Sequence, residues 1–105
     1  MKKFEIEIIR QLLLDSDLEG LLPILDSPRA VVEFSGVGYF ITVRNYRLPT
    51  TRRVLDSLDM RGKLGGVEVG YLAFIEASEL TLECYSYGDE INSTHREKGF
   101  VQTAT

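Results

Sequence analysis

Apolar side chains near the start of the chain recur every three or four positions, a spacing typical of one buried helical stripe. The stripe consists of Phe4, Ile8, Ile9, Leu12 and Leu13. Residues 4–8 also alternate between apolar and charged side chains, as a strand does. The continuation through residues 10–14 favours a helix, so we expect one helix over residues 2–14.

The next apolar cluster predicts a second, shorter helix that ends before Pro28. Ser16 or Asp17 is its expected N-cap, because both side chains accept hydrogen bonds from the free N–H groups of a first turn. Pro23 either lies within the first turns or breaks the segment into two pieces, since proline has no N–H to donate. The apolar positions of this helix are Leu18, Leu21, Leu22, Ile24 and Leu25.

From residue 29 onward, β-branched and aromatic residues predominate, which is typical of strands. Residues 30–35 and 38–44 predict two strands joined at Gly36 and Val37. Glycine in the first position of a two-residue loop favours a type II′ hairpin, because that position needs a positive φ. In this register one face of the hairpin carries Val32, Phe34, Tyr39, Ile41 and Val43.

The clearest alternation lies over residues 60–87 and predicts further antiparallel strands. Two glycines at residues 65–66 are expected to form a tight turn. This turn opposes Lys63 and Glu68 across neighbouring strands, a favourable pair of opposite charges.

A second turn is expected at residues 77–78, although a four-residue loop over residues 76–79 pairs the same faces. The two-residue turn places Glu76 opposite Glu79, where like charges repel each other. Either turn leaves one wholly apolar face for the helices to cover, which carries Val69, Tyr71, Ala73, Ile75, Leu80, Leu82 and Cys84. The other face is mixed, with an aromatic ring expected over a glycine, and carries Gly70, Leu72, Phe74, Glu83, Tyr85 and Tyr87.

The whole pattern predicts a single α+β domain over residues 1–88. One or two N-terminal helices pack on one face of a mainly antiparallel sheet of about 4–6 strands. Residues 45–53 are expected as a polar loop, followed by a short strand or helical turn near residues 54–55. Residues 89–105 lose the apolar pattern and are expected as a surface tail, partly disordered.

Composition narrows the classes of function. The chain has a single cysteine, Cys84, so an intramolecular disulfide is excluded, and a single histidine, His95. They also argue against a metal site, and no cofactor motif is found. The start Met1-Lys2-Lys3 resembles a signal peptide, but charged residues soon interrupt any apolar region. No stretch approaches the ~20 uncharged residues of a membrane helix, so we expect a cytoplasmic protein without a membrane partner.

Charge is unevenly distributed along the chain. Residues 44–63 hold six cationic side chains and two aspartates, whereas the whole chain has a net charge of −4. An acidic protein is repelled by the phosphate backbone at long range. Nucleic acid is therefore not expected as a partner, while the basic segment is a candidate contact for an anion or another protein.

Two parts of the chain resemble the signatures of a family of small uncharacterised bacterial proteins. Residues 33–42, E-F-S-G-V-G-Y-F-I-T, are similar to the family pattern E-F-[ST]-G-V-G-[FY]-F-x-T. Residues 70–75 and 80–88 are similar to its closing hairpin, G-[FY]-x-x-F … L-E-x-[FY]-[ST]-Y. The chain departs at Cys84, where the family has glycine, and in a longer tail without the usual tryptophan. The resemblance implies a helical N-terminus and two hairpins, with some members encoded near toxin–immunity gene sets, and it implies no activity.

Three candidates for chemistry each have a structural alternative. Residues 36–38 lack the third glycine and the following helix of a nucleotide-binding loop, so a hairpin turn explains them. Cys84 with His95 as its base would form a nucleophile, but free cysteines on an apolar face are commonly buried. Glu33 and Glu83 would form a catalytic carboxylate pair if their strands were neighbours. Otherwise they are solvated or paired with arginines.

The basic loop is the most suggestive feature, because arginine forks bind carboxylates and phosphates and both Arg and Tyr are favoured at interfaces. The alternative is that its arginines neutralise acidic neighbours such as Glu33 and Glu83. The candidate binding residues are Arg44, Tyr46, Arg47, Arg52, Arg53, Glu83, Tyr85 and Tyr87.

A non-enzymatic protein-interaction module, such as an immunity-like inhibitor or a small regulatory binder, is the leading functional hypothesis. The second is a homodimeric structural module closed by the mixed sheet face. The third is a small enzyme or ligand-binding protein that uses Glu33, Glu83 and the loop arginines.

Overall fold

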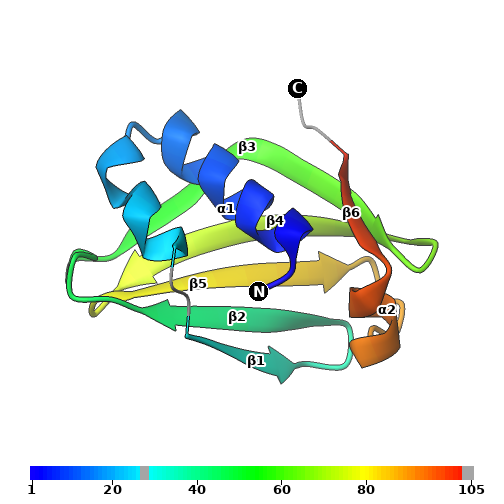
Figure 1. The fold of residues 1–105 in the computed structure, drawn as a ribbon. Coiled ribbons are helices and arrows are strands. Elements are labelled where there is room, and N and C mark those ends of the chain that lie inside the picture. Colours follow the sequence, from blue (N-terminus) through cyan, green and yellow to red (C-terminus); the bar gives the residue numbers. More distant parts are fainter. Residues whose placement is uncertain (27–28, 103–105) are drawn as a thin grey trace.

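The structure is a computed structural model that describes residues 1–26 and 29–102 of the chain. Helix α1 (Lys3–Asp15) lies across one face of a six-stranded antiparallel sheet (Figure 1). A 3₁₀ helix, η1 (Glu19–Leu25), follows α1 and packs against it. This arrangement confirms the α+β fold class expected from the sequence.

Helix α1 forms because its apolar stripe is covered by the sheet. Fully burying one such side chain contributes about 1.5–3 kcal/mol. The helix ends at Asp15 with Ser16 as its C-cap, and Asp17 then adopts a φ of +57° that turns the chain toward η1. The residues of α1 with no exposed surface include Ile8, Ile9, Leu12 and Leu13.

The second helix begins differently from the prediction. Its N-cap is Leu18, without a side-chain hydrogen bond, so the expected cap at Ser16 or Asp17 is wrong. The left-handed φ of Asp17 places that residue in a turn, whereas an N-cap needs a more extended backbone. Pro23 lies inside η1, and the predicted end at Pro28 falls outside the described residues.

The six strands lie in the order β1-β2-β5-β4-β3-β6, and every neighbouring pair is antiparallel. Side chains on successive strand residues point to opposite faces. We call the face that packs against α1 the inner face and the opposite one the outer face. The strands are β1 (Ala30–Phe34), β2 (Gly38–Arg44), β3 (Arg53–Leu64), β4 (Val67–Glu76), β5 (Glu79–Ser86) and β6 (Gly99–Gln102).

The inner face forms the hydrophobic core with the helices. The row expected beneath a helical lid is buried there, which confirms the alternation from residue 67 onward. Below this lid, each of the following is at most 2% exposed: Tyr39, Ile41, Leu55, Met60, Leu64, Val69, Tyr71, Ala73, Ile75, Leu80, Leu82 and Cys84.

The first two tight turns have the expected register. Gly36 adopts a φ of +95° in the β1–β2 turn, where the Ser35 N–H donates to the Gly38 carbonyl at 3.0 Å. Gly65 and Gly66 adopt φ of +55° and +88° in the β3–β4 turn. Because L side chains rarely adopt these angles, glycine fixes the position of both turns.

The β4–β5 turn consists only of residues 77–78, an Ala-Ser pair with φ of +52° and +60°. The two-residue alternative is therefore correct, and Glu76 opposes Glu79. Two arginines offset the repulsion that this register creates. Arg52 Nη1 lies 2.9 Å from a carboxylate oxygen of Glu76, and Arg44 Nη2 lies 3.0 Å from one of Glu79.

Strand β3 is longer than the sequence predicts. It begins at Arg53, within the expected loop, and continues to Leu64. Its pairing with β4 shifts register between Leu55 and Met60. A register shift interrupts the alternation of side chains between the two faces of the sheet. For this reason the pattern alone predicted only a short element near residues 54–55.

The segment expected as a surface tail contains further structure as far as residue 102. Helix α2 (Ser93–Glu97) follows Ile91, which is buried, and β6 then pairs with the end of β3. This segment has few apolar residues, so no hydrophobic pattern predicted these elements. The rest of the tail, residues 103–105, lies outside the described residues.

A close backbone approach makes Gly38 intolerant of any side chain. A Cβ at this position would collide with the backbone carbonyl oxygen of Cys84 on the neighbouring strand β5. We expect Gly38→Ala to lower the free energy of unfolding by about 3 kcal/mol, as measured by urea denaturation. Gly20→Ala is the matched control, since no atom lies within 4 Å of its added Cβ. Similar stability of the two variants would contradict this reading.

Candidate interaction surface

The outer face of the sheet is the face that helices α1 and η1 leave uncovered. Helices α1 and η1 lie over the other face (Figure 1). Side chains of the outer face are half-buried or exposed, in contrast to the fully buried inner row. Its apolar members are Val31, Phe40, Val54, Leu72, Phe74, Tyr85 and Tyr87.

Two tyrosines form the aromatic end of the outer face. The ring of Tyr85 lies over Gly70, where an added Cβ would come within 2.6 Å of the phenol. Tyr87 is 62% exposed and meets Tyr85 edge to face, with ring centroids 6.0 Å apart. Burial raises the pKa of Tyr85, with a further contribution from Tyr87. The predicted placement of an aromatic ring over the glycine is confirmed.

Glu33 and Glu83 both lie on the outer face but are not adjacent. Strand β2 separates their strands, and Phe40 pairs with Glu33 on one side and with Glu83 on the other. Neither carboxylate forms an ion pair within residues 1–26 and 29–102. The geometry of a catalytic pair, two carboxylates converging on one cleft, is not formed.

The arginines expected to neutralise these two glutamates have other partners. Arg44 and Arg52 bind the hairpin glutamates at residues 76 and 79. The Arg52 guanidinium also lies 4.9 Å from the centre of the Phe74 ring, within the range of a cation–π contact. Arg44 and Arg52 therefore neutralise acidic neighbours within the domain, as the alternative held, but these are Glu79 and Glu76 and not Glu33 or Glu83.

The remaining loop candidates point in different directions. Tyr46 is 85% exposed, and the Arg47 guanidinium lies 5.6 Å from its ring centre. Arg53 instead donates to the Ser16 carbonyl at the end of α1, at 2.7 Å. The loop lies near one end of β5 and Tyr85 near the other, about 20 Å away at the usual rise per strand residue. The candidate binding residues therefore do not form one cluster.

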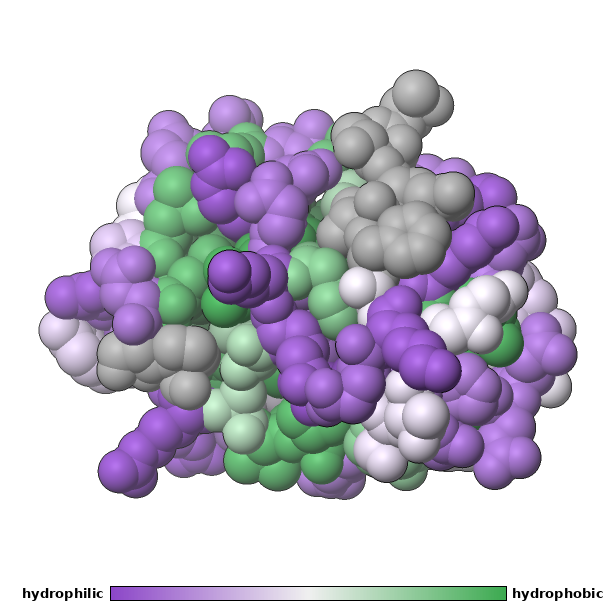
Figure 2. All heavy atoms as spheres, turned by 45° about the vertical axis from the view of Figure 1, so that its right-hand side comes forward, coloured by the Kyte–Doolittle hydropathy of each residue, from purple (hydrophilic) through white to green (hydrophobic). Residues whose placement is uncertain are grey.

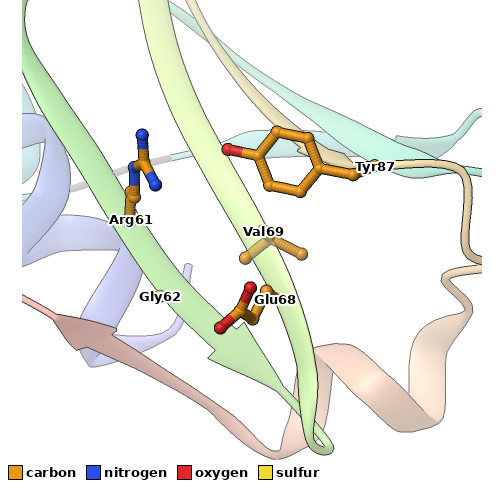
Figure 3. Close-up of a pocket in the computed structure, with 5 residues that line it drawn as sticks. All are labelled: Arg61, Gly62, Glu68, Val69 and Tyr87. Atoms are coloured by element: carbon orange, nitrogen blue, oxygen red, sulfur yellow. The ribbon is translucent and has the colours of Figure 1, made fainter.

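A small pocket lies beside Tyr87, between the ends of β3 and β4 (Figure 3). Arg61, Gly62, Glu68, Val69 and Tyr87 line its volume of about 90 Å³. The Arg61 guanidinium lies 2.9 Å from a carboxylate oxygen of Asp59, whose hydrogen bond raises the pKa of Arg61. This space holds about three water molecules and is small beside a typical cofactor site.

A buried ionic cluster lies on the other side of the sheet, and sequence reasoning missed it. Glu5 has no exposed surface, and Arg96 of α2 donates to both of its carboxylate oxygens at 2.7 Å. The Tyr39 hydroxyl and the Lys2 backbone N–H each donate to Glu5, also at 2.7 Å. A glutamate one turn into a helix is a capping signal, but nothing in the sequence links it to Arg96.

The cluster continues toward a buried thiol and a buried phenol. Burial raises the pKa of Cys84 to about 12, so this thiol stays protonated near neutral pH. The Tyr71 hydroxyl has no hydrogen-bond partner among the described residues. His95 lies in α2, where the Asn92 backbone N–H donates to its Nδ1 at 3.1 Å. These properties match the structural alternative for Cys84 and not an activated nucleophile.

The side of the molecule that carries α2 and β6 is mostly hydrophilic, with smaller hydrophobic areas (Figure 2). In the part of the chain that the structure describes, no helix is long and apolar enough to cross a membrane. Those residues also contain no group of three or more histidine, cysteine or acidic side chains able to hold a metal ion. Comparison of the chain with protein-family models, curated proteins and solved structures finds no match.

Proposed function

We propose that this protein is a non-enzymatic interaction module that binds another protein through the outer face of its sheet. The observation that carries the proposal is a row of half-buried apolar side chains on a sheet face that α1 and η1 leave uncovered. Glu83 and Thr81 lie among these apolar side chains, and such a mixture of apolar and polar groups is typical of non-obligate protein interfaces. Phe40, Leu72 and Phe74 form the centre of the row, and Tyr85 and Tyr87 form one end.

The proposed role is that of a cytoplasmic inhibitor or regulator, as in an immunity-like protein that occupies its target. Such a role needs a rigid, stable surface and no reacting groups. The outer face meets this need because its backbone is held in the sheet, so little conformational entropy is lost on binding. The described residues also lack the convergent carboxylates that the enzyme alternative required.

Affinity capture from a native lysate tests which surface binds. Wild-type protein is compared with the double variant Val31→Lys/Tyr87→Lys, which changes two exposed outer-face residues, and with Arg47→Glu in the loop. All three are expected to fold, because Val31, Tyr87 and Arg47 are exposed. We expect a saturable partner that is retained by the wild type and Arg47→Glu and is lost by the double variant. Equal retention by all three, or loss with Arg47→Glu alone, would contradict the outer face as the contact.

A further inference from the structure

We infer that the outer face binds a basic segment of its partner, with an arginine or lysine over Phe40 between Glu33 and Glu83. This inference rests on the proposed function and specifies the chemistry of the partner. It follows from the unpaired charges on the face and from the aromatic ring between them. It also follows from the repulsion that a second copy of the chain would meet there.

The charge of the outer face is unbalanced at its centre. The cations near its borders already have partners: Arg44 with Glu79, Arg52 with Glu76, and Arg61 with Asp59. Lys63 stands opposite Glu68 in the pairing of β3 with β4. Among the described residues of the face, Glu33, Glu68 and Glu83 form no ion pair. Glu68 has Lys63 opposite it, whereas no cation stands opposite Glu33 or Glu83, so the centre carries two negative charges with no cation beside them.

The spacing of these two charges suits a single cationic side chain. Glu33, Phe40 and Glu83 occupy one row across β1, β2 and β5. Neighbouring strands lie about 4.8 Å apart, so the two backbone positions are about 10 Å apart with the Phe40 ring between them. A guanidinium or ammonium group above the ring would gain a cation–π contact and lie between both carboxylates.

The molecule already contains one contact of this kind on the same face. The Arg52 guanidinium lies over the Phe74 ring while it binds Glu76. A cation that contacts an aromatic ring and a neighbouring carboxylate is therefore compatible with the shape of this sheet. In the proposed complex, the partner supplies the equivalent cation for Phe40.

A second copy of this chain is a poorer occupant. Two outer faces brought together would contribute four carboxylates, from Glu33 and Glu83 of each copy, to one interface. Arg44, Arg52 and Arg61 of each copy are engaged with other carboxylates, and juxtaposed like charges disfavour an interface. A basic segment of a different protein has the complementary charge.

The probe is a short peptide of alternating arginine and valine, titrated into the isotope-labelled full chain and followed by NMR. Alternation places the arginines on one side of an extended peptide. We expect shifts to concentrate at Glu33, Phe40 and Glu83. The variant Glu33→Gln/Glu83→Gln is expected to weaken binding roughly fivefold to tenfold, the effect of two partly exposed ion pairs. Glu19→Gln/Glu90→Gln is the matched control, since it removes the same charge elsewhere and should bind like the wild type.

Four results of the titration and of light scattering would overturn the inference. They are no binding, shifts away from this row, equal weakening by both double variants, and a wild-type dimer by light scattering whose interface is the outer face. The capture experiment judges the proposed function separately. A partner that is lost with Val31→Lys/Tyr87→Lys and is still captured equally by Glu33→Gln/Glu83→Gln would support the outer face as the contact. The same result would contradict the inference that the partner binds through a basic segment.

Discussion

Replacing Arg96 with methionine is expected to lower the free energy of unfolding by about 3–5 kcal/mol. The change leaves the Glu5 carboxylate fully buried without its cation, and two hydrogen bonds of 2.7 Å are lost with it. Methionine keeps much of the side-chain volume, so the loss reports mainly on charge. Since domains of this size are stable by about 5–15 kcal/mol, the variant should unfold at a much lower urea concentration.

Two further variants separate the buried pair from a general effect of charge. Arg10→Met removes an exposed ion pair with Glu7 and is expected to cost less than about 1 kcal/mol. The double variant Glu5→Met/Arg96→Met should recover part of the lost stability, because it removes the uncompensated charge as well. Equal stability of Arg96→Met and Arg10→Met in urea denaturation would contradict the role given to the pair.

Stability is also expected to fall steeply at alkaline pH, by about 5 kcal/mol between pH 8 and pH 11. Burial raises the pKa of Cys84 to about 12, and burial also raises the pKa of Tyr39 and Tyr71. In the unfolded chain a thiol ionises near pH 8.5 and a phenol near pH 10, at about 1.4 kcal/mol per unit of pKa difference. Above those values the unfolded state has released protons that the folded state still holds. The free energy of unfolding therefore decreases as pH rises.

The measurement is urea denaturation at a series of pH values, with tyrosine ionisation followed by absorbance. Cys84→Ala should remove about 3 kcal/mol of the loss between pH 8 and pH 11, because it removes the group that ionises first in the unfolded chain. A free energy of unfolding that stays constant from pH 8 to pH 11 would show that these groups titrate alike in both states.

Much of the architecture is predictable because it depends on neighbours in the chain. The three-to-four spacing of apolar residues predicts α1, and turn residues set the register of the hairpins. Gly36 illustrates this, since only a residue tolerant of positive φ suits the first position of that turn. Once a turn is placed, alternation assigns each strand residue to the inner or outer face, which is why the outer face was predicted correctly from residues 70–87.

The predictions that failed for the candidate site concern groups far apart in sequence. Arg52 and Glu76 are 24 residues apart, and Arg44 and Glu79 are 35 apart, so their pairing depends on the strand order. The same order separates Glu33 from Glu83 by placing β2 between β1 and β5. Periodicity assigns a side chain to a face but not to a neighbour.

Local sequence alone was enough to specify the first helix, the two glycine turns and the two faces of the sheet, because spacing and backbone angles act over a few residues. The fold itself decided the order of the strands, the addition of α2 and β6, and the burial of Glu5 against Arg96, 91 residues away. A charge is stable in the core only when folding brings its partner to it. No pattern within either segment contains that information.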